Sequence, residues 1–281
     1  MSGRVVVFGA ASWNTMIRVE TFPDPAPGSV FPQGWHEAVG SSGAGKALNL
    51  ARLGVEVTLH CLLGDDEAGA RVRATLEDAG VTVDAVRDPT GTARHVNLMD
   101  GSGRRLSFLL HTGDPAARYD PTRVEQLVAA ADHVLAEIVE PARAVLPVAR
   151  RLGRPTWTDL HDSRGERSWD DDFRTADRVF FSTEHMADPR PFMERLLAAG
   201  RELVVATRAA AGAIALSAAN GWLEVPAVPV EGVVDTNGAG DAFLAGVVHG
   251  ELIGLPIRES LALGATVAAR AVQSPELAPP P

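Results

Sequence analysis

Short runs of apolar, often β-branched residues alternate with amphipathic segments along most of the chain. Runs of roughly four to eight such residues bounded by turn residues predict buried strands. The expected strands cover 5–8, 55–63, 81–86, 133–138, 156–159, 178–181, 203–207, 213–217 and 221–225. The segments between them have helical spacing of apolar side chains, and helices are expected at 41–53, 67–79, 121–131, 141–152, 191–199, 240–250 and 258–271. This alternation predicts an α/β fold with a central, mostly parallel sheet flanked by helices.

Two parts of the first half of the chain do not follow this alternation of strands and helices. Thr92–Leu98 and Arg105–Leu110 are joined by a glycine-containing turn and predict a β-hairpin. The stretch Phe22–Gly34 is rich in proline and matches neither a strand nor a helix. We expect a small β-lid, formed by segments of about 14–38 and 92–111 and attached to a single domain that spans residues 1–281.

Composition narrows the class of protein. The chain has 281 residues, 46% of them apolar, which suffices for one large α/β domain with a buried core. A formal net charge of −10 argues against a protein that binds the phosphate backbone of nucleic acids. No apolar run approaches the roughly 20 residues of a membrane helix, and Cys61 is the only cysteine. We therefore expect a cytoplasmic protein without nucleic-acid or membrane partners, and a short disordered end at Ser274–Pro281.

A turn of small residues precedes the predicted helix at 240–250. Gly238, Ala239 and Gly240 carry little or no side chain, so their backbone N–H groups approach an anion closely at the helix N-terminus. Asp241 follows and places a carboxylate beside this anion hole. Such a carboxylate accepts the proton of a hydroxyl that attacks a bound phosphate. The local sequence leaves a second interpretation open, in which Asp241 is only a first-turn residue favoured by the helix dipole.

The segment Asp235–Phe243 resembles the C-terminal signature of the PfkB, or ribokinase-like, family of sugar and nucleoside kinases, Asp-Thr-x-Gly-Ala-Gly-Asp-x-Phe. Four other segments resemble the family's first strand with its substrate loop, its glycine-rich helix start, its Leu-Gly-Asp-Asp turn and its nucleotide-flanking strand. They are Val5–Asn14, Gly40–Gly54, Leu63–Asp66 and Leu203–Gly212. Since the resemblance covers nearly the whole chain, it favours the interpretation of Asp241 as a base.

The resemblance implies a ribokinase-like fold with a small β-lid that closes over the substrate. It implies transfer of the γ-phosphoryl group of ATP to a hydroxyl, expected to be primary, with Asp241 as the base. Gly238, Ala239 and Gly240 would form the anion hole, and Mg²⁺ would bridge the phosphates. Family members also use an Asp at the position of Asp235 in a monovalent-cation site, so such a cation is a further expectation.

The resemblance also assigns the binding residues. The expected substrate-binding residues are Asn14, Gly40, Ser41, Lys46 and Asn49. The expected nucleotide-binding residues are Ser182, Thr207, Gly212, Asp235 and Thr236.

Several positions depart from the family pattern. Asn14 stands where the family commonly has an Asp that grips two sugar hydroxyls, and Gly45 stands where an Asn is usual. The family's Asn-x-x-Glu pair falls on Ser182 and His185, with Glu184 beside it as the candidate metal ligand. The strand end Asp159–Arg164 only approximates the family's Asp-x-Asn-x-Arg. The substrate is therefore expected to be bound differently from ribose in ribokinase.

The segment Gly40–Lys46 fits the pattern G-x-x-x-x-G-K of a P-loop. A P-loop requires Ser or Thr next, to bind Mg²⁺, and this chain has Ala47 there, so the P-loop is rejected. Lys46 is the only lysine among 26 basic residues. Two interpretations of it remain open: a residue that points into the sugar site, or a solvated lysine at a helix start.

These observations predict an ATP-dependent kinase for a sugar or sugar derivative. One alternative is a nucleoside kinase of the same family, whose more apolar pocket would use Trp13 or Trp35. The other is a non-catalytic sugar- or nucleotide-binding relative, which the altered Asn-x-x-Glu pair suggests. Because a lid sheet leaves one face to cover, a homodimer through the lid is also expected.

Overall fold

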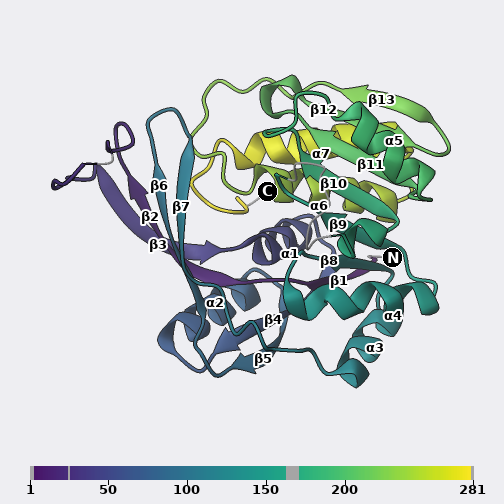
Figure 1. The fold of residues 1–281 in the computed structure, drawn as a ribbon, viewed down its shortest axis with the longest axis horizontal. Helices are drawn as coiled ribbons and strands as arrows, with labels where there is room; N and C mark the ends of the chain where they lie inside the picture. Colours follow the sequence, from purple (N-terminus) through teal and green to yellow (C-terminus); the bar gives the residue numbers. More distant parts are fainter. Residues whose placement is uncertain (1–2, 25, 163–170, 280–281) are drawn as a thin grey trace.

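The computed structural model describes residues 3–24, 26–162 and 171–279, and two sheets organise them (Figure 1). The larger sheet has nine strands in the order β13-β12-β11-β10-β9-β8-β1-β4-β5. Adjacent strands are parallel from β5 through β11. β12 pairs antiparallel with β11, and β13 pairs antiparallel with β12. The strands are β1 Arg4–Phe8, β4 Glu56–Gly64, β5 Thr82–Asp88, β8 His133–Ala136, β9 Thr156–Asp159, β10 Arg178–Ser182, β11 Leu203–Thr207, β12 Ala213–Ser217 and β13 Gly221–Val225. The predicted mostly parallel sheet is confirmed.

Helices cover both faces of this sheet, which explains why its strands read as continuous apolar runs (Figure 1). In β1, Val5 and Val7 face one core, while Val6 and Phe8 face the other. The first core is closed by α1 Ser42–Arg52, α2 Glu67–Asp78, α6 Ala239–Leu252 and α7 Ile257–Ala271. The second is closed by α3 Pro121–Ala130, α4 Val145–Arg151 and α5 Arg190–Ala198.

The segment predicted as one helix over 141–152 is divided. A 3₁₀ turn, Glu140–Ala144, comes first, and α4 follows. The division places Pro147 in the first turn of α4. A proline lacks the N–H that a continuous helix would need there, whereas a first turn does not use it.

The second sheet has four strands in the order β3-β2-β6-β7 and lies to one side of the main sheet (Figure 1). Its strands are β2 Ser12–Arg18, β3 Gly34–Gly40, β6 Ala93–Met99 and β7 Arg105–His111. The β6–β7 hairpin is the predicted one, and β2 joins it in parallel. β2 and β3 escaped the hydropathy pattern because polar residues occupy many of their positions. The segments predicted as the lid supply all four strands.

The expectation of a disordered C-terminal end is wrong for the part that the structure describes. Leu277 and Ala278 are 9% and 5% exposed and belong to the core that contains α6 and α7. The backbone oxygen of Leu277 accepts a hydrogen bond from Asn49 Nδ2 at 3.2 Å. Long-range contacts, which composition does not reveal, therefore hold the tail; Pro280 and Pro281 lie outside the described residues.

Among the described residues, no helix is both long enough and apolar enough to cross a membrane.

Candidate active site

The candidate site lies where the strand order of the main sheet reverses. From β1 the chain continues through β4 to β5 on one side, and β8 begins the run toward β13 on the other. Loops at the carboxyl ends of strands diverge at such a point and leave a crevice for ligands. Glu137 directly follows β8, Asp159 ends β9, and the N-terminal halves of α1 and α6 supply Lys46 and Asp241.

The turn of small residues directly precedes α6. Gly238 adopts a φ of 77°, a left-handed conformation that favours glycine, and α6 begins at the next residue. The Ala239 N–H donates to the Thr236 oxygen at 3.3 Å. Among the described residues, the N–H groups of Gly240 and Asp241 have no backbone partner. These free donors at the positive end of a helix dipole can hold an anion.

Asp241 is buried beside this turn, and one of its oxygens is held by Lys46. The Lys46 Nζ donates to Asp241 Oδ1 at 2.6 Å. Within the described residues, Oδ2 has no hydrogen-bond partner and approaches the backbone of Gly45, where a Cβ atom would collide with it. The glycine at position 45, where the family usually has Asn, therefore lets the Asp241 carboxylate lie directly against the backbone of α1.

Lys46 has no exposed surface, and its ammonium lies among acidic side chains. Besides Asp241 Oδ1, Nζ lies 3.0 Å from Glu137 Oε1 and 3.1 Å from Asp159 Oδ2. The His161 ring closes the group, with Nε2 3.4 Å from Glu137 Oε2 and Nδ1 3.6 Å from Asp159 Oδ2. We call these five residues the lysine cluster.

In the lysine cluster, burial and neighbouring charges shift the pKa values in opposite directions. Burial raises the pKa of Asp159, but the attraction of Lys46 and His161 outweighs it and lowers that pKa to about 2. Burial lowers the pKa of His161, yet the carboxylates of Asp159 and Glu137 raise it to about 9. For Asp241, burial raises the pKa and the nearby Lys46 opposes the rise only in part, so the net shift is upward.

The expected substrate residues at the start of the second sheet lie together. The Ser12 hydroxyl donates to Asn14 Oδ1 at 2.8 Å, and its oxygen lies 2.7 Å from the Ser41 hydroxyl. Gly40 ends β3 beside Asn14, and a Cβ atom there would overlap the Asn14 amide. Asn49 is committed elsewhere, because its Nδ2 donates to the backbone oxygens of Gly45 and the C-terminal tail.

The expected nucleotide residues come from neighbouring strand ends. Ser182 ends β10 and pairs in register with Thr207, which ends β11. Gly212 follows at a φ of 82° and so requires glycine. Glu184 is exposed just beyond β10, and its N–H donates to the Ser182 hydroxyl at 3.2 Å.

The other two residues expected to bind the nucleotide, Asp235 and Thr236, lie in the turn before α6. Asp235 Oδ1 accepts the Asn237 N–H at 2.7 Å, and burial raises the Asp235 pKa. The second sheet reaches this same turn, because Thr236 Oγ1 donates to the Gly103 oxygen at 2.8 Å and Arg105 donates to the Asn237 side-chain oxygen.

Glu137 and His161 were not singled out by sequence reasoning, and Asp159 appeared only as part of a strand end. A usable signal was present: Glu137 and Asp159 each carry a charge where a short, fully buried strand ends. Such positions lie at the ligand-binding edge of a parallel sheet. Ser163 and Arg164, which complete the predicted strand-end motif, lie outside the described residues.

Comparison with known proteins agrees with this geometry. The profile of the pfkB family carbohydrate kinases matches residues 2–146 and 178–281. The chain is 36% identical to the acarbose 7(IV)-phosphotransferase of Actinoplanes sp. (strain SE50/110), over 96% of this chain and 92% of that protein. It is 26% identical to the fructoselysine 6-kinase of Escherichia coli K12, over 87% and 93%.

Solved structures show the same relationship. A microbiome-derived acarbose kinase superposes with a TM-score of 0.89 at 30% identity, over 98% of this chain and 94% of that one. The ribokinase of Arabidopsis thaliana has the same fold, with a TM-score of 0.83 at 19% identity over 99% and 95% of the two chains. The predicted ribokinase-like fold and kinase family are thus confirmed. The chain belongs to the pfkB family and is a carbohydrate kinase.

Proposed function

We propose that this kinase transfers the γ-phosphoryl group of ATP to a hydroxyl, expected to be primary, of a sugar derivative related to acarbose, with Asp241 as the base. The acceptor class rests on the two relatives named for acarbose, at 36% and 30% identity over nearly the whole chain. The observation that carries the chemistry is the unpartnered Oδ2 of Asp241 beside the free N–H groups at the start of α6.

In this proposal the acceptor hydroxyl gives its proton to Asp241 Oδ2 while its oxygen attacks the γ-phosphorus and the bond to the ADP oxygen breaks. Burial raises the Asp241 pKa, which makes the carboxylate a stronger base than a solvated one. The N–H groups of Gly240 and Asp241 stabilise the charge on the transferring group, with Gly238 and Ala239 shaping the turn.

The sugar is proposed to lie between Asp241 and the strand ends of the second sheet. Asn14, Gly40 and Ser41 lie together there and offer amide, backbone and hydroxyl groups for sugar hydroxyls. Asn49 and Lys46 are buried and committed to other partners, so we expect them to shape this pocket from behind.

ATP is proposed to bind along Ser182, Thr207 and Gly212, with its phosphates directed at Asp235 and Thr236. Mg²⁺ fits this arrangement, because it keeps several waters and is bound mainly by substrate phosphates and one or two carboxylates. Glu184 is the proposed carboxylate, and the described residues contain no ready-made cluster of three metal-binding side chains. A monovalent cation near the buried Asp235 remains a prediction. Because ATP is the donor, we place the reaction in the cytoplasm.

The geometry does not favour a nucleoside acceptor bound by Trp13 or Trp35. Side chains alternate along β2, so Trp13 lies on the opposite face from Asn14. Trp35 pairs with Ile17, which is on that same opposite face, and is 67% exposed. A non-catalytic relative would have no use for a buried carboxylate with one free oxygen.

Replacing Asp241 by Asn tests the base directly. The amide keeps the shape but cannot accept the proton, so we expect kcat to fall about 10²- to 10⁴-fold. ADP release would be measured with Mg²⁺-ATP and a panel of acarbose, simple sugars and nucleosides. Asp132→Asn is the matched control, because Asp132 pairs with Arg4 at the opposite end of the sheet. Full turnover by Asp241→Asn, or no turnover of any acceptor by the wild type, would contradict the proposal.

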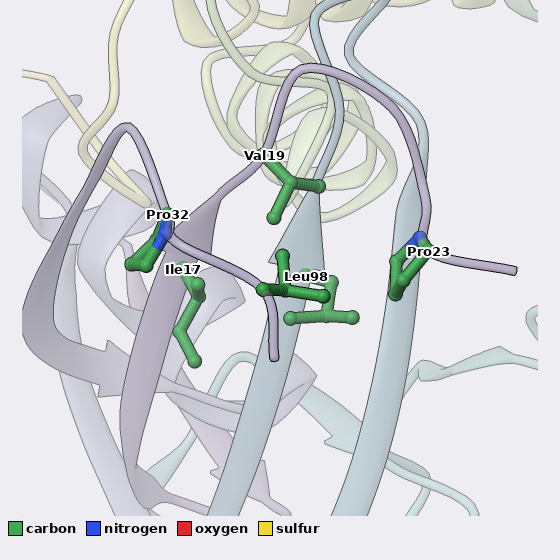
Figure 2. A pocket seen from close by; sticks show the side chains of 6 residues that line it. Ile17, Val19, Pro23, Pro32 and Leu98 are labelled. Atoms are coloured by element: carbon green, nitrogen blue, oxygen red, sulfur yellow. The ribbon is translucent and has the colours of Figure 1, made fainter. Parts of the chain in front are cut away.

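We also propose a homodimer through the outer face of the second sheet. Trp35, Leu106 and Phe108 lie on the face opposite Asn14 and are 67%, 44% and 50% exposed. On the same face, an apolar pocket lies under the β2–β3 loop (Figure 2). It is lined by Ile17, Val19, Pro23, Val30, Pro32 and Leu98. A second copy would cover this surface.

A further inference from the structure

Lys46 is the only lysine of the chain, and no part of its side chain reaches solvent. An ammonium has three hydrogens, and Asp241, Glu137 and Asp159 each place an oxygen within 3.1 Å of it. The ammonium donates a hydrogen bond to Asp241 Oδ1, the oxygens of Glu137 and Asp159 lie 3.0 and 3.1 Å from it, and it has no exposed surface on which to meet a sugar hydroxyl. Any contribution of Lys46 to the reaction must therefore pass through its partners.

Stability alone is a weak reason for such a group. Removing several ions from water offsets most of their mutual attraction, and apolar residues of similar volume often serve a fold equally well. Every other basic residue except histidine in this chain is arginine. Arginine presents a planar fork, whereas three carboxylates converging on one atom need the point-like charge of a lysine.

We propose that Lys46 is a positioning residue for phosphoryl transfer: its ammonium holds Oδ1 of Asp241 and thereby aims Oδ2 at the acceptor hydroxyl. The proposal rests on the proposed function, in which Asp241 is the base. The 2.6 Å hydrogen bond fixes Oδ1, whereas Oδ2 has no hydrogen-bond partner among the described residues and lies against the backbone of Gly45, in space that a side chain there would take.

Lys46 also sets the charge that Asp241 experiences. Glu137, directly after β8, repels a charge on Asp241, while Lys46 from α1 and His161 after β9 attract it. Removing the ammonium leaves the repulsion and removes the largest attraction. The Asp241 pKa then rises, and with it the pH below which the enzyme loses activity.

The test combines Lys46→Met with Asp159→Asn, so that the lysine cluster loses one positive and one negative charge. Asp159→Asn alone is the reference, because it leaves the ammonium on Asp241. Relative to this reference we expect kcat to fall about 100-fold or more, as for a misplaced catalytic group. We expect the KM for ATP to stay within about twofold, and the acid limb of kcat/KM to move to higher pH.

Two further variants separate positioning from folding. Lys46→Arg keeps the charge but not the geometry, so we expect kcat to fall at least about tenfold with the acid limb near its wild-type pH. Arg178→Met removes a cation that bridges Glu251 and Glu202 at the far end of β10. It should lower the melting temperature while leaving kcat and the pH profile unchanged.

Wild-type kcat and an unmoved acid limb in the folded double variant would overturn the proposal. If the double variant does not fold, wild-type kcat in Lys46→Arg overturns it equally. An equal loss of kcat in Arg178→Met would show that Lys46 acts only through stability. If Asp241→Asn itself keeps full turnover, the proposed base fails, and that result is distinct from a failure at Lys46.

Discussion

His161 combines backbone strain and charge in one residue. Its φ is 52°, a left-handed conformation that is uncommon for a residue with a side chain. The His161 N–H donates to Asp159 Oδ1 at 2.9 Å, and its carbonyl accepts the Ser182 N–H at 2.5 Å. Strained residues of this kind concentrate at functional sites. Here the strain places an imidazole over the two carboxylates that also bind Lys46.

The raised pKa of His161 predicts a pH dependence of stability. The pKa is about 9 in the folded protein and about 6.5 when unfolded. The stabilising charge is therefore fully present below about pH 6.5 and is lost as the pH rises through about 9. His161→Asn removes the charge and tolerates the left-handed backbone. Between pH 6.5 and 9, urea unfolding should show a free energy that falls more steeply for wild type than for His161→Asn; equal slopes would contradict this.

At the scale of elements, the β6–β7 hairpin and the turn before α6 depend on each other. The hairpin turn contributes the Gly103 oxygen, and β7 contributes Arg105, to the turn that contains Thr236 and Asn237. These partners are more than 130 positions apart in the sequence. In the proposed mechanism, a second sheet that closes on the substrate would also order the turn before α6.

Arg105→Ala tests this coupling. Losing one hydrogen bond, worth about 0.5–1.5 kcal/mol net, should raise the KM for ATP and sugar about two- to tenfold and change kcat less. Arg104→Ala is the matched control, since Arg104 pairs with Asp100 within its own turn and, in the described part of the chain, has no hydrogen bond or ion pair with the α6 turn. Steady-state kinetics with varied ATP and sugar would measure both. An identical KM in the two variants would argue against the coupling.

At the scale of the whole molecule, the two faces of the second sheet carry different side chains. One face carries Asn14 and, through Arg105, meets the α6 turn. The opposite face carries Trp35, Leu106 and Phe108, whose side chains are exposed, while α2 contacts this face at Trp13. Exposed apolar side chains that gather on one face of a sheet are typical of a protein–protein interface.

The predicted dimer can be tested by changing this outer face alone. Leu106→Glu with Phe108→Glu places two charges in the expected interface, so sedimentation equilibrium should show monomers where the wild type is dimeric. Leu109→Glu is the matched control, because Leu109 is 62% exposed on the same strand but faces the other way. A monomeric wild type, or a double variant that stays dimeric, would contradict the prediction.

The sequence alone determined the main sheet, most of its helices and the glycine-containing turn before α6. Continuous apolar runs mark strands buried on both faces, and the consecutive small residues Gly238–Gly240 mark a turn at a helix start. The second sheet was only partly predictable, because β2 and β3 carry polar residues toward the site and so lose the apolar signal.

Only the tertiary structure decided the meaning of Lys46 and of the C-terminal tail. Local sequence left Lys46 either facing the sugar or solvated at a helix start. Its partners Glu137, Asp159 and Asp241 lie 91, 113 and 195 positions away, and the folding of β8, β9 and α6 around α1 brings them to one ammonium. Leu277 in the tail likewise becomes part of the core only because the fold places it against Gly238. Whether charged residues gather or a chain end is buried depends on which elements meet in the folded chain. The local sequence pattern does not contain that information.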